Sequence, residues 1–230
     1  MKKALNIAAG ISLFLFLPAA PFLFAGFGAE VLKILKGVSI ADARWSAFLL
    51  GAAAFLPVHF LAGKFFPGAR RYLETLEHEL THLLIGLLFL KIPVGIRVSA
   101  HSGGEVRQIG FGTTGQIWIT LAPYFFPTAS LFVLLFSFAA GFEDFVLLAL
   151  LGFTTAFHLI SNWSETSFRQ PDLQKAGILK TILILPLMNL LCYGAVLAFT
   201  GGGRTGFVRF WTQGFAQSVD FLKAFFGLIT

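Results

Sequence analysis

Two histidines and a glutamate stand close together in the stretch EHELTHLLIG, residues 77–86. His78, Glu79 and His82 form the pattern H-E-x-x-H, and residues four apart share one face of an α-helix, so both imidazoles can converge on one metal ion. Zn²⁺ favours such nitrogen ligands, and a catalytic zinc site keeps one position open for water. Zinc lowers the pKa of that water, and Glu79 can take its proton as a general base. The pattern predicts a hydrolytic zinc site.

Two histidines leave a further protein ligand to be found along the chain. The extension H-E-x-x-H-x-x-G-x-x-H is absent, because the apolar residues 83–85 follow His82. Asp172 comes directly after Pro171 in a short polar stretch, and a carboxylate there would offset the charge of the metal in a low-dielectric site. His158 is the main alternative, since a three-histidine zinc site is chemically possible. The other polar candidates are Glu143, Asp144 and Glu165.

The composition is that of an integral membrane protein. Of the 230 residues, 57% are hydrophobic and 12% are charged, about half of the roughly 25% typical of a soluble domain. Lipid requires every backbone polar group to be bonded internally, so a spanning chain forms helices or a closed barrel. The apolar runs are continuous rather than alternating, which favours helices. The basic residues that give the net charge of +6 are scattered along the chain, so we expect no nucleic acid among the partners.

Six apolar segments approach the roughly 20 residues of helix that a bilayer core requires. They lie at about 5–27, 45–62, 72–90, 117–140, 145–160 and 178–199. The third segment carries H-E-x-x-H, and the glycines at 201–203 predict a break after the sixth. The tail at 204–230 mixes charged and amide side chains with Phe and Trp, which is typical of a helix lying in the membrane interface. We therefore expect an all-α polytopic membrane protein with about six transmembrane helices, forming a single domain over residues 1–230.

The segment after the H-E-x-x-H helix has a different pattern. Val94, Ile96 and Val98 alternate with other residues, turn residues follow at 102–104, and β-branched residues return at 106 and 109. Alternation on both sides of turn glycines indicates a hairpin. We expect a small, membrane-associated β-hairpin over residues 94–109, next to the predicted zinc site.

Several of these motifs, in this order, resemble the site-2 protease family of intramembrane zinc metalloproteases. They are HELTH (78–82), SGGEV (102–106), LAPYFFP (121–127), FHL (157–159) and QPDL (170–173). More narrowly, these motifs resemble a small bacterial branch of that family, whose members lack a PDZ domain. It covers a metalloprotease core at residues 72–195, and it leaves out two additional N-terminal spans in 1–71 and the amphipathic tail at 204–230.

The resemblance implies roles for four residues. In that family two histidines and a distant aspartate bind zinc and the glutamate is catalytic, which implies that His78, His82 and Asp172 are the ligands and that Glu79 is the base. The usual Leu-Asp-Gly-Gly around the aspartate is replaced here by Pro-Asp-Leu-Gln at 171–174. The family's β element is thought to bind substrate by adding a strand, and such edge pairing is physically reasonable.

We therefore expect a zinc metalloendopeptidase that cleaves membrane-protein substrates, bound in extended form, in or near their transmembrane segments. The resemblance implies a bacterial inner (cell) membrane, with the lipid bilayer as the surrounding partner. Two alternatives stay open. A membrane zinc hydrolase resembling the CAAX-processing enzymes would use Glu143 or Glu165 as its third ligand. A non-enzymatic metal-binding membrane protein would need a closed site of four protein ligands.

Overall fold

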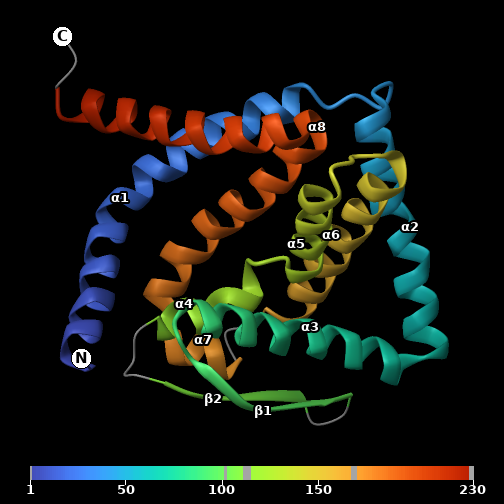
Figure 1. Cartoon of the computed structure of the whole chain (residues 1–230), viewed down its shortest axis with the longest axis horizontal. Coiled ribbons are helices and arrows are strands. Elements are labelled where there is room, and N and C mark those ends of the chain that lie inside the picture. The colour runs from blue at the N-terminus through green and yellow to red at the C-terminus, as the bar shows by residue number, and fades with distance from the viewer. Residues whose placement is uncertain (1, 101–102, 111–114, 167–169, 228–230) are drawn as a thin grey trace.

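The computed structural model describes residues 2–100, 103–110, 115–166 and 170–227, and it is mostly helical (Figure 1). The elements in chain order are α1 (Lys2–Lys36), α2 (Ala43–Phe65), α3 (Pro67–Leu88), β1 (Ile92–Ser99), β2 (Gly103–Ile109), α4 (Gln116–Leu121), the 3₁₀ helix η1 (Ala122–Tyr124), α5 (Thr128–Ala140), α6 (Phe145–Glu165), α7 (Pro171–Ala176) and α8 (Ile178–Phe225). The predicted helical class and the predicted hairpin are both confirmed.

The helices include four that are long and apolar enough to cross a membrane. They are the Pro18–Lys36 part of α1, then α2, the Phe145–Trp163 part of α6, and α8. A fifth span arises if the pair Gln116–Tyr124 and Thr128–Ala140, bent by 92° at its break, counts as one. The chain is therefore a membrane protein by the length and composition of its helices, and the expected count of six spans is not confirmed.

The difference lies mainly in the segment that carries H-E-x-x-H. It forms α3, which is not among the candidate spans of the described residues, and α3 lies across the ends of α2, α5 and α6 (Figure 1). Residues 67–79 of this helix carry two arginines and three glutamates. The uncharged end of this helix, residues 83–88, rises only about 9 Å at 1.5 Å per residue, against the roughly 30 Å of a hydrocarbon core.

The predicted break at residues 201–203 is a kink rather than an end. The helix α8 continues through Gly203, whose φ of 58° and ψ of −149° are non-helical. Only glycine suits this position, because a Cβ atom there would overlap the carboxylate of Glu143 and L side chains avoid this φ. The expected sixth span and the expected interfacial tail are thus two arms of one bent helix. The second arm lies beside the C-terminal half of α1 (Figure 1).

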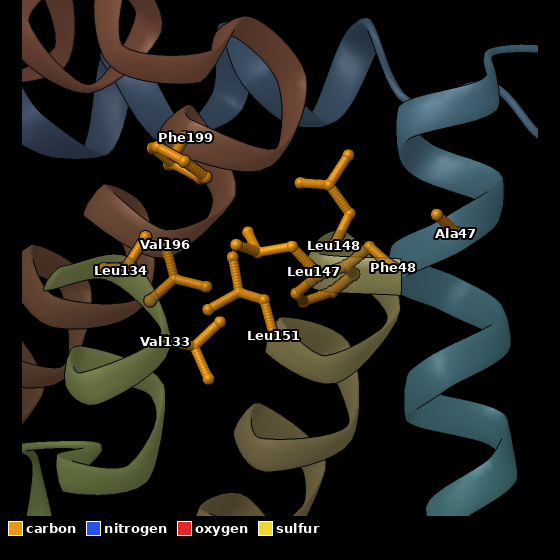
Figure 2. Close-up of a cluster of buried hydrophobic side chains, with 9 residues drawn as sticks. All are labelled: Ala47, Phe48, Val133, Leu134, Leu147, Leu148, Leu151, Val196 and Phe199. Atoms are coloured by element: carbon orange, nitrogen blue, oxygen red, sulfur yellow. The ribbon is translucent and has the colours of Figure 1, made fainter. Parts of the chain in front are cut away.

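The core of the bundle joins α2, α5, α6 and the first arm of α8. Figure 2 shows its side chains, with the leucines of α6 lying between α2 on one side and α5 and α8 on the other. Glycines bring α2 and α6 close together, because Gly51 packs on the backbone of Ala149 and Gly152 on that of Phe48. Small residues permit such close approach in membranes, where the hydrophobic effect between helices is weak. The nine buried residues are Ala47, Phe48, Val133, Leu134, Leu147, Leu148, Leu151, Val196 and Phe199.

Candidate metal centre

The helix α3 presents both histidines of H-E-x-x-H on one face. It begins with Pro67 in the first turn, where the missing N–H costs nothing. The ring centroids of His78 and His82 lie 4.9 Å apart, and the His78 ring meets the edge of Tyr124 at 5.5 Å. The local helix therefore brings the two imidazoles together, as the spacing of four residues predicts.

Asp172 reaches the same place from the short helix α7. Its Oδ2 atom lies 3.6 Å from His78 Nε2 and 3.3 Å from His82 Nε2. One ligand atom from each of the three residues lies within 4.8 Å of the others, and each side chain is partly buried. Among the described residues, this is the group of three or more His, Cys, Asp or Glu that could hold a metal ion.

The geometry at His82 favours a cation between these groups. Its Nδ1 atom lies 2.8 Å from the carbonyl oxygen of Ile119, which can only accept, so Nδ1 must carry the hydrogen. The Nε2 atom of the neutral ring then turns a lone pair toward the Asp172 carboxylate, 3.3 Å away. Two acceptors at this distance need a proton or a metal ion between them. A histidine that donates its second nitrogen to a carbonyl is also the usual arrangement of a metal ligand.

The electrostatics of Asp172 suit the same role. Burial disfavours its ionised form, but the close imidazoles of His78 and His82 outweigh burial and hold the pKa of Asp172 below its usual range. The carboxylate is therefore ionised at neutral pH, which is the form that binds a metal. Lys175 lies 3.5 Å from the other carboxylate oxygen, on the exposed side.

Glu79 faces the same cavity as two of the three residues. The cavity has a volume of about 290 Å³, and Glu79 itself is 6% exposed. Elements far apart in the sequence enclose it: α3, β2, α4 and α7. Its lining residues are Glu79, His82, Lys91, Gly104, Glu105, Val106, Gln108, Gln116, Ile119, Thr120, Asp172 and Lys175.

The hairpin is fixed to α3 through β2. The two strands pair antiparallel from Ile92 with Ile109 to Ser99 with Gly103, with an irregularity between Pro93 and Gly95. The Gln108 amide donates to the carbonyl oxygens of His82 and Leu83, at 3.1 and 3.3 Å. The Gln108 side chain occupies the space in which a larger residue at Gly86 would place its Cβ atom. These contacts hold β2, the strand nearest the cavity, in a fixed position against α3.

Gly104 of β2 touches Glu79, and this contact gives a first testable expectation. A Cβ atom at Gly104 would overlap the Glu79 side chain, so Gly104→Ala must displace the carboxylate. Misplacing a catalytic group by about 1 Å can cost roughly 100-fold in rate, and we expect kcat to fall by about 10- to 100-fold with zinc content unchanged. Kinetics on the purified variant, with metal analysis, would measure both.

The matched control for that variant is Gly95→Ala in β1. There the atoms nearest to the added Cβ atom would be those of the guanidinium end of the flexible Arg107 side chain, at 3.3 Å or more. Gly95→Ala should keep near-normal turnover. Equal losses in the two variants would show that the hairpin tolerates no side chain at either glycine and would remove the specific link to Glu79.

The other candidate ligands are not part of this group. His158 of α6 is buried and lines a small pocket together with His78, but its Nδ1 atom pairs with Glu77 Oε2 at 3.2 Å. Glu143 pairs with Arg44 at 2.9 Å beside the kink of α8. Asp144 caps the N-terminus of α6 by accepting from Leu147 N at 2.8 Å. The side chain of Glu165 lies outside the described part of the chain.

Several residues at the site were not singled out by the sequence patterns. Lys91, 7% exposed, lines the cavity beside Glu79, although its sequence position marks only the end of an apolar run. Lysine is almost never this buried unless it is paired, but the sequence alone does not show that Lys91 is buried. Gln108 carries one weak signal, since it is an amide within a run of β-branched residues. Ile119 takes part only through its backbone.

Searches against known protein families, curated proteins and solved structures found no match for this chain.

Proposed function

We propose that this protein is a membrane-embedded zinc metalloendopeptidase that hydrolyses peptide bonds in or near transmembrane segments of membrane-protein substrates. The observation that carries the proposal is the meeting of His78, His82 and Asp172 beside a cavity that His82, Asp172 and Glu79 line. Two nitrogens and one carboxylate oxygen leave a position of a tetrahedral zinc site open, as catalysis requires. The resemblance of the sequence motifs to the site-2 protease family supports the same conclusion, and it supports a bacterial inner membrane as the location.

The chain's own residues account for the remaining chemistry. His82 is held by Ile119 with Nε2 turned to the site, and Asp172 supplies negative charge. Glu79, which lines the same cavity, would hold the proton that a nucleophilic water releases and pass it to the leaving amine. Zinc, when bound between the three ligands, supplies the positive charge that lowers the pKa of a water and polarises a carbonyl.

The strand β2 supports a peptide as the substrate. It lines the cavity and, within the described residues, pairs only with β1, so its other edge can hydrogen-bond an extended chain. Edge pairing would require a transmembrane substrate to unwind locally, because the backbone groups of an intact helix are already paired. The helix α3 and the hairpin lie at one end of the bundle (Figure 1). An unwound segment can therefore reach β2 there without exposing its unpaired backbone groups to the lipid.

The position of Glu143 bears on the main alternative. A CAAX-like zinc hydrolase would take a glutamate as third ligand, but Glu143 is engaged by Arg44 and by the backbone N–H of Arg204. The aspartate brought to the two histidines instead belongs to the ligand set of the site-2 proteases. The proteolytic function is preferred because the carboxylate that meets the two histidines is that of an aspartate.

Metal removal and restoration would test the proposal. Purified protein is added to membrane vesicles, and new peptide N-termini are identified by mass spectrometry, with and without 1,10-phenanthroline and then after zinc is returned. We expect new N-termini within or beside transmembrane segments, lost on chelation and regained with zinc. New termini that persist in the chelator, or none at all from several vesicle sources, would contradict a zinc endopeptidase.

A further inference from the structure

A second, apolar cavity lies on a different side of α3 from the metal centre. It has a volume of about 510 Å³ and is enclosed by α2, α3, α5 and α6. Its walls are built from aromatic and aliphatic side chains that include Phe55, Leu76, Phe132 and Phe157. Two of the helices that form it, α2 and α6, are candidate membrane spans. The cavity is therefore suited to hydrocarbon rather than to a polar ligand.

The cavity borders the elbow between α2 and α3, and this elbow is basic. Arg70 lines the cavity, and Lys64 and Arg71, which are both exposed, lie in the elbow outside the lining. The Arg70 guanidinium is held in place: Nη1 lies 3.2 Å from His59 Nε2, and the group packs beside Gly63. Its Nε atom is buried and makes no hydrogen bond, with the Glu74 carboxylate 3.8 Å away. The three basic side chains outnumber the one buried carboxylate, so the elbow carries a net positive charge.

The same elbow carries the aromatic residues of a membrane interface. Phe65, Phe66 and Tyr72 are 60%, 67% and 43% exposed. Aromatic and basic side chains gather at the headgroup level, where a spanning helix ends, and α2 ends at Phe65. By this rule the basic elbow lies at the level of the lipid phosphates, and the apolar cavity lies on the hydrocarbon side of them.

We propose that the cavity binds one acyl chain of an anionic phospholipid whose phosphate lies at Arg70, Lys64 and Arg71. Clusters of basic side chains at the membrane surface select anionic lipids, and the partly exposed Arg70 guanidinium can bind phosphate oxygens through charge-assisted hydrogen bonds. A substrate helix fits poorly. A cylinder about 10 Å across, the width of a helix, would fill 510 Å³ over about 6 Å, little more than one turn.

The inner end of the cavity meets the joint between α3 and α5. Glu77 and Ala129 line it, and Glu77 Oε1 accepts a hydrogen bond from Ala129 N at 3.3 Å. Thr81 and Thr128 bond to each other beside them, at 2.5 Å. A bound acyl chain therefore packs against the contacts that hold the helix of His78 and His82 in place. Anionic lipid stabilises that helix, whether or not the protein is an enzyme.

Competition between lipids tests the proposal without reference to zinc or to activity. Purified protein is equilibrated with equal amounts of palmitoyl-oleoyl phosphatidylglycerol and phosphatidylcholine in detergent, and native mass spectrometry counts the lipids retained. We expect phosphatidylglycerol to be retained about tenfold over phosphatidylcholine, from basic side chains at the headgroup. The melting temperature should rise with phosphatidylglycerol and change little with phosphatidylcholine. Equal retention of the two lipids by the wild type would overturn the proposal.

Two pairs of variants locate the site. Arg70→Gln with Arg71→Gln should abolish the headgroup preference, whereas Lys180→Gln, an exposed basic residue on α8, should keep it. Ala62→Phe should fill the cavity and reduce retention of phosphatidylglycerol at least fivefold, whereas Ala54→Phe, on an exposed part of α2 outside the cavity lining, should not. An unchanged preference in the arginine variant, or unchanged retention in Ala62→Phe, would also overturn it. If the arginine variant does not fold, the wild-type preference and Ala62→Phe still decide.

Discussion

Glu79→Gln is expected to abolish peptide hydrolysis while zinc stays bound. The glutamine keeps the size and shape of the side chain and its place beside Gly104, but it cannot take a proton. General acid–base catalysis contributes roughly 10²- to 10⁴-fold to a rate, so we expect kcat to fall by about that factor. Single-turnover cleavage of a membrane substrate, with metal analysis of the same sample, would measure both quantities.

Glu105→Gln is the control for this variant. Glu105 lines the same cavity from β2 and is exposed, so its loss removes one negative charge without removing the base. It should change turnover by less than about tenfold. Retained turnover in Glu79→Gln would point to a role without hydrolysis, and equal losses in both variants would indicate that cavity charge, rather than a specific proton acceptor, matters.

Asp172→Ala is expected to remove the metal itself. It deletes the carboxylate that lies 3.3 and 3.6 Å from the two histidine nitrogens and leaves two imidazoles, too few for a stable zinc site. We expect zinc affinity to fall by more than about 100-fold, beyond the 10- to 100-fold typical of losing a partner that only orients a ligand. Competition with a chelator of known affinity would give the value.

His158→Ala is the matched comparison for Asp172→Ala. It removes the other ligand that the sequence allows, a residue whose Nδ1 atom pairs with Glu77. Zinc affinity should fall by no more than about tenfold, as expected for a contact that supports α3 from behind. Full zinc binding in Asp172→Ala together with loss in His158→Ala would reverse the assignment and require a three-histidine site.

The parts of this protein that its sequence determined are those that depend on local periodicity. His78 and His82 share a face because any helix brings residues four apart together. The hairpin follows from β-branched alternation around a turn, although β1 begins earlier, at Ile92, and β2 includes Gly103 and Gly104, which the pattern assigned to the turn. The membrane class follows from long apolar helices, which occur in α1, α2, α6 and α8.

Tertiary structure decided what local pattern leaves open. Asp172 meets His82 across 90 positions of sequence, a contact that depends on how α7 packs and not on any spacing. The charged residues of α3 decided its position across one end of the bundle, because charged side chains are costly beside the lipid that surrounds the middle of the bundle. The kink at Gly203 joined a span and a tail because both arms pack elsewhere, one in the core of Figure 2 and the other along α1. The contact between Gly104 and Glu79 was also decided by the tertiary structure. A contact between two elements depends on burial and shape over the whole fold, and no short stretch of residues encodes it.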